Sequence, residues 1–81
     1  MKNRYSDGAI PAQAVLARDS IAKQLRDTRH SQGLTQEVLA ERAGTKKSNI
    51  SRMESGKYNP SLDFLVKVAS SMGKTIDIHL T

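Results

Sequence analysis

Residues 35–61, TQEVLAERAGTKKSNISRMESGKYNPS, decide the fold. Thr35 is a good N-cap for a short helix, which Gly44 ends. Thr45 caps a second short helix, which ends at Gly56. The apolar sides of the two helices are formed by Val38, Leu39, Ala43, Ile50 and Met53. The stretch therefore predicts two short helices joined by a tight turn that contains glycine.

The flanking sequence predicts further helices. Residues 11–32 place apolar side chains three or four positions apart, which indicates one helix or two in succession. Ser61 caps a last helix, which ends at Gly73. Its core side comprises Leu62, Leu65, Val66, Ala69 and Met72. We therefore expect a helical domain over residues 11–73, preceded by a flexible arm over residues 1–10.

The end of the chain changes period. Apolar and polar residues alternate over residues 74–80, which is a strand pattern. The apolar face of this strand comprises Ile76, Ile78 and Leu80. A lone strand leaves its backbone N–H and C=O groups unpaired in a helical chain. We therefore predict that residues 74–81 pair with the same strand of a second copy and form a homodimer; a frayed tail is the alternative.

Charge and composition limit the classes of function. The 81 residues suffice for one domain, and 13 basic against 8 acidic residues give a net charge of +5, which favours an anionic partner. The basic residues gather between Arg42 and Lys57, where five stand against one acid. With no cysteine and only two distant histidines, we expect neither a metal nor a cofactor. No catalytic triad, phosphate loop or carboxylate pair appears, so we expect no enzyme.

No apolar run approaches the roughly 20 residues that span a bilayer. The N-terminus also lacks the apolar region of a secretory signal. We therefore expect no membrane partner, and a cytoplasmic, nucleoid-associated protein.

The layout of residues 35–57 is that of a helix-turn-helix pair, which presents its second helix to the major groove of DNA. The N-terminus of that helix adds a positive dipole end and free N–H groups, both suited to phosphate. Polar side chains point outward or lie near this N-terminus: Lys46, Lys47, Ser48, Ser51 and Arg52. The pattern predicts binding to double-stranded DNA.

Residues 29–73 resemble the Cro/C1-type (Xre family) helix-turn-helix domain of phage repressors and many bacterial regulators. The resemblance is carried by four motifs: L-T-Q at 34–36, L-A-x-x-A-G at 39–44, I-S-R-x-E-x-G-K at 50–57 and P-S-L at 60–62. It implies a mainly α fold, a small lambda-repressor-like bundle of four to five helices, to which this chain adds its C-terminal strand.

The resemblance also implies roles for individual residues. The family's base-facing positions hold Lys47, Ser48, Ser51 and Arg52. The positions near the DNA backbone hold Gln36, Thr45, Lys46, Asn49, Lys57 and Asn59. Arg29 and Glu54 match a pair that forms a buried salt bridge between the first and third helices of the family. The resemblance therefore assigns Glu54 a structural role.

The C-terminal strand departs from family members that continue with a fifth helix. It is similar to that of HipB-like and HigA-like antitoxins, in which a C-terminal strand pairs across the dimer. Such antitoxins bind a toxin protein and repress their own operon. We therefore expect a repressor that reads a palindromic operator as the antitoxin of a toxin–antitoxin pair. The alternative is a stand-alone phage-type or restriction-controller repressor without a toxin partner.

Overall fold

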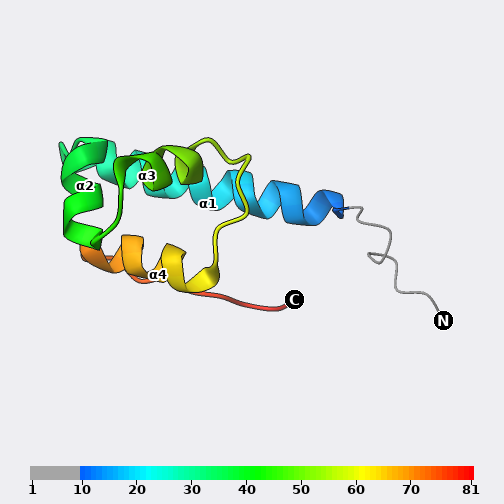
Figure 1. The fold of residues 1–81 in the computed structure, drawn as a ribbon. Coiled ribbons are helices and arrows are strands. Elements are labelled where there is room, and N and C mark those ends of the chain that lie inside the picture. The colour runs from blue at the N-terminus through cyan, green and yellow to red at the C-terminus, as the bar shows by residue number, and fades with distance from the viewer. Residues whose placement is uncertain (1–9) are drawn as a thin grey trace.

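The computed structural model describes residues 10–81, and helices occupy most of them (Figure 1). The four helices are α1 (Ala12–Ser31), α2 (Gln36–Ala43), α3 (Lys47–Glu54) and α4 (Leu62–Ser71). The predicted helical bundle is thus confirmed with four helices, and α1 is one uninterrupted helix rather than two. Its N-terminal turns project beyond the other three helices (Figure 1). The predicted arm, apart from Ile10, lies outside the described residues.

Side-chain caps fix where α2 and α4 begin. The hydroxyl of Thr35 accepts a hydrogen bond from the Val38 N–H at 3.1 Å, and that of Ser61 accepts one from the Phe64 N–H at 3.1 Å. Gly44 ends α2 in the left-handed conformation, with φ 65°, where a side chain would be strained.

The prediction that Thr45 caps α3 is wrong. The N-cap is Lys46, and no side chain caps this helix. The Thr45 hydroxyl instead accepts a hydrogen bond of 2.9 Å from the Asn49 side-chain amide. Thr45 therefore holds the turn before α3 rather than the first backbone N–H groups of the helix.

The core lies where α2 packs against α3 and α4, with α1 packed against α3. Its fully buried large side chains are Leu39, Ile50, Met53 and Val68. Two residues predicted for the core side of α4, Leu62 and Val66, are exposed instead. Val68 lies inward instead. It forms one buried stripe with Ala69 and Met72, since Ala69 and Val68 stand three and four positions before Met72.

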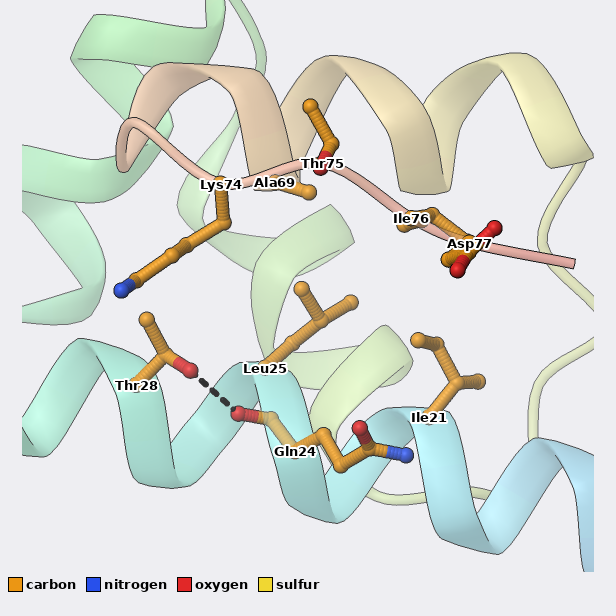
Figure 2. A pocket seen from close by; sticks show the side chains of 9 residues that line it. All are labelled: Ile21, Gln24, Leu25, Thr28, Ala69, Lys74, Thr75, Ile76 and Asp77. Carbon is orange, nitrogen blue, oxygen red and sulfur yellow. Dashed lines mark hydrogen bonds between the residues drawn. The ribbon is translucent and has the colours of Figure 1, made fainter.

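The predicted C-terminal strand is not formed in the single chain: among residues 10–81 no β-pairing is present. The physical reason is that residues 10–73 are helices and turns and offer no strand to pair with. After the Lys74 N–H donates to the Ala69 carbonyl at 2.9 Å, the chain runs on alongside α4 (Figure 2). Residues 74–77 line a pocket together with residues 21–28 of α1. Half-buried Ile76 packs against the core, whereas Ile78 and Leu80 are exposed. Pairing across a dimer stays a prediction.

None of the helices in the part of the chain that the structure describes is long and apolar enough to cross a membrane.

A buried ion pair joins α1 to α3. Arg29 and Glu54 are 8% and 5% exposed, and two parallel hydrogen bonds connect them, from Nε to Oε2 at 2.7 Å and from Nη2 to Oε1 at 2.9 Å. Glu54 Oε1 also accepts from Gln36 Nε2 at 3.1 Å, and Arg29 Nη1 donates to the Leu34 carbonyl at 2.8 Å. The pair thus ties together α1, the start of α2 and the end of α3.

The ionised form of Glu54 is favoured in the folded protein. Burial by itself raises the pKa of Glu54, but the hydrogen bonds from Arg29 and Gln36 and the Arg29 charge outweigh it, so that this pKa lies below its usual value. The hydrogen bond with Glu54 likewise raises the pKa of Arg29. Both groups are therefore charged at neutral pH, and the buried site holds no net charge.

Removing one partner of the pair should destabilise the fold strongly. Arg29→Met or Glu54→Met leaves the other charge buried and unpaired, which typically costs about 3–5 kcal/mol. The double variant, with no charge left in the pair, should lose much less than the sum of the two single losses. Urea unfolding followed by circular dichroism measures the three losses. Asp27→Asn is the matched control, because it breaks the exposed pair of Asp27 with Lys23 and should barely move the midpoint. Additive losses in the double variant would contradict this account.

The stability of the fold should also fall in acid. Because the pKa of Glu54 is lower in the folded protein than in the unfolded chain, its contribution is present above the unfolded value of about 4.3. It is lost as the pH falls further, through the lower pKa of the folded state. Unfolding free energies measured from neutral pH downward should therefore drop more steeply for the wild type than for Glu54→Met. Parallel curves for the two proteins would show that Glu54 does not carry the acid dependence.

Candidate nucleic-acid interface

The exposed face of α3 carries the four residues predicted to read bases, and we call this surface the reading face. Its residues Lys47, Ser48, Ser51 and Arg52 are all exposed, whereas Ile50 and Met53 on the opposite side of the helix are buried. The split follows from helical spacing, because positions three apart fall on one face. Two of the four residues are basic and two carry a hydroxyl, so the reading face can donate to base edges and to phosphate oxygens.

The start of α3 is open toward solvent. Lys46 and Lys47 are exposed at the first turn, and no side chain caps the helix, in contrast to α2 and α4. The first N–H groups of a helix have no partner within the helix, and the dipole there favours a negative charge. The start of α3 therefore combines the exposed ammonium group of Lys46 with uncapped backbone donors, which together suit a phosphate.

The residues predicted to lie near the DNA backbone fall into two groups. Lys46, Lys57 and Asn59 are exposed, the latter two in the loop between α3 and α4. The others are half-buried and hydrogen-bonded within the protein: Gln36 donates to Glu54, and Asn49 donates to Thr45. Gln36 thus lies against the buried ion pair and holds the end of α3, whereas the hydrogen bond between Asn49 and Thr45 stabilises the turn before α3.

The sequence does not predict one acidic residue that lies at the candidate interface. Glu37, in the first turn of α2, has its Oε1 2.9 Å from Nζ of Lys47, and both side chains are more than half exposed. The hydrogen bond with Lys47 lowers the pKa of Glu37 below its usual value. Because the two residues belong to different helices, no spacing rule within one helix connects them. Only the angle between α2 and α3 brings them together.

Comparison with known proteins gives the family. The family model described as Helix-turn-helix matches residues 23–79. A protein of Haemophilus influenzae named as an uncharacterized HTH-type transcriptional regulator is 36% identical over 61 residues, 75% of this chain and 62% of that protein. A protein of the same name from Methanothermobacter thermautotrophicus is 42% identical over 50 residues, 62% of this chain and 72% of that protein. The chain therefore spans less than two thirds of the Haemophilus relative.

Two solved structures share the fold. An HTH_3 family transcriptional regulator from Vibrio cholerae matches with a TM-score of 0.72 at 31% identity, over 76% of this chain and 35% of that one. A toxin–antitoxin module from Streptococcus pneumoniae matches with a TM-score of 0.69 at 30% identity, over 99% of this chain and 94% of that one. With its α2–turn–α3 geometry, the chain belongs to the helix-turn-helix family of Cro/C1 (Xre) type that its sequence resembles.

Proposed function

We propose that this protein is a sequence-specific DNA-binding repressor that reads a palindromic operator as a homodimer. We further propose that it is the antitoxin of a toxin–antitoxin pair and that it represses its own operon. The observation that carries the proposal is the reading face: a short helix anchored on one side by a buried core and bearing Lys47, Ser48, Ser51 and Arg52 on the other. Helix-turn-helix proteins insert a helix of this kind into the major groove.

The chemistry of the reading face supports different roles for its basic residues. Arg52 is exposed in the last turn of α3 and can donate two parallel hydrogen bonds to guanine O6 and N7. Lys57 lies beyond the helix, in an exposed loop, where a single flexible ammonium suits phosphate. Gln36 has two proposed roles: it contacts a DNA phosphate, and it holds the end of α3 through its hydrogen bond to Glu54.

Exposed apolar side chains support the homodimer. In the single chain Ile78 and Leu80 are 61% and 98% exposed, although the alternation of the tail marks them as one apolar face with Ile76. Ile78 lines a groove of about 540 Å³ whose lining also includes Ile21, Leu62 and Leu65. Within residues 10–81, the backbone of 75–81 forms no hydrogen bond to other backbone groups. A second copy of the tail would satisfy those groups and cover the apolar face.

The extent of the structural likeness supports the antitoxin. The likeness to the Streptococcus pneumoniae toxin–antitoxin module covers nearly the whole of both chains, tail included, whereas the Vibrio cholerae regulator is a much longer chain. Expression together with the product of the neighbouring gene tests the assignment: an antitoxin should co-purify with that protein in a tight complex. A protein that purifies alone but binds its operator would instead be the stand-alone repressor.

Arg52 and Lys57 should separate specificity from affinity. Arg52→Ala should relax the preference at one operator base pair, with a loss of about 1–3 kcal/mol of discrimination. Lys57→Ala should weaken binding to all sequences alike and lower the salt slope of log K by about one. Fluorescence anisotropy on a duplex selected from a random pool, with single-base variants, measures both. Equal effects of the two substitutions on every duplex would refute the assigned roles.

The tail should control the oligomeric state. Ile78→Lys with Leu80→Lys places two charges on the apolar face while keeping Ile76 on the core, and should shift the protein from dimer to monomer in light scattering. Thr75→Lys with His79→Lys, on the alternate face, adds the same lysines and should leave the dimer intact. A footprint of two half-sites about 34–36 Å apart is expected for the wild type. An unchanged dimer in the first variant would exclude tail pairing.

A further inference from the structure

The contact between Glu37 and Lys47 is the starting point, because it places a carboxylate on a surface proposed to meet an anion. Among residues 10–81, this is the one ion pair that bridges α2 and α3. Both side chains are well exposed, 62% for Glu37 and 57% for Lys47, and the ammonium lies at hydrogen-bond distance, 2.9 Å. The pair can therefore open and close without unfolding any part of the bundle.

Among residues 10–81, the other basic groups at this surface have no acidic partner. Within the described part of the chain, Lys46, Arg52 and Lys57 form no ion pair with any carboxylate. Of these four basic residues, Lys47 therefore differs, because Glu37 compensates its charge before DNA binds. DNA must compete with Glu37 for Lys47, whereas it meets the other three directly.

Fold stability does not explain why Glu37 contacts Lys47. An acid in the first turn of a helix is stabilised by the helix dipole, and Asp63 occupies the same place in α4 with no lysine partner among residues 10–81. An exposed ion pair adds little to stability. The dipole therefore accounts for an acid in the first turn of α2, but not for its position against a residue of the reading face.

We propose that Glu37 sets DNA specificity by competing with phosphates for Lys47, an inference that rests on the proposed DNA-binding function. At an arbitrary DNA sequence, a phosphate that binds Lys47 only replaces the contact of Lys47 with the Glu37 carboxylate by another contact with one anion. The Glu37 carboxylate is then left unpaired, facing the anionic DNA backbone. At the operator, a base edge with two acceptors, such as guanine O6 and N7, offers the ammonium more. Glu37 therefore weakens non-specific binding more than specific binding.

Glu37→Gln tests the proposal, because it keeps the size of the side chain and removes its charge. Binding is measured by fluorescence anisotropy across a salt series, on a duplex that the wild type selects from a random pool and on its scrambled counterpart. The variant should bind the scrambled duplex several-fold more tightly, with a salt slope steeper by about 0.9, the value for one added phosphate contact. On the selected duplex the slope should not change, so the specificity ratio falls.

A second substitution separates competition for Lys47 from plain repulsion between Glu37 and DNA. In a Lys47→Gln background, Glu37→Gln should leave the slope on the scrambled duplex unchanged. The matched control is Asp27→Asn, which removes the same charge and frees Lys23 on α1, and should also leave the slope unchanged. An equal slope for Glu37→Gln and the wild type, or a steeper slope that persists without Lys47, would overturn the inference alone. Failure of the wild type to bind either duplex would overturn the proposed function itself.

Discussion

The buried pair of Arg29 and Glu54 is the constraint on which the arrangement of the bundle depends. Apolar contacts among Leu39, Ile50 and Val68 supply attraction, but attraction of this kind has no direction and tolerates rotation of one helix against another. Two charges with almost no exposure to solvent do not tolerate it, because any geometry that separates them leaves both unsatisfied. Of the orientations that bury the apolar side of α3, the pair therefore selects the one in which the carboxylate meets the guanidinium.

The first turn of α2 extends this constraint to both ends of α3. Gln36 donates to Glu54, the last residue of α3, and Glu37 contacts Lys47, the first. Two neighbouring residues thus hold one helix at its two ends, and they do so with different strength. The contact at Glu54 is buried and belongs to a network of hydrogen bonds, whereas the contact at Lys47 is exposed and screened by solvent. The end of α3 is accordingly fixed, and the side chain at its start is free to exchange partners.

A feature of this fold can be predicted from the sequence where it depends only on residues near to one another in the chain. The starts of α2 and α4 follow from Thr35 and Ser61, because a cap acts within three residues of itself. The inward stripe of α4 could not be chosen from the sequence, since α4 is apolar around much of its circumference and only packing against α2 selects Val68 over Leu62 and Val66.

The same limit applies to the candidate site. The outward positions of α3 follow from the 3.6-residue period, which also places Ile50 and Met53 inside. The contact of Glu37 with Lys47 depends on the angle between two helices, which no periodicity encodes. The tail is the intermediate case: its alternation is local and predicts an extended chain, but a strand also needs a partner, and residues 10–73 of the same chain offer none. In the single chain Ile76 is half-buried because it reaches the chain's own core, whereas Ile78 and Leu80 stay exposed.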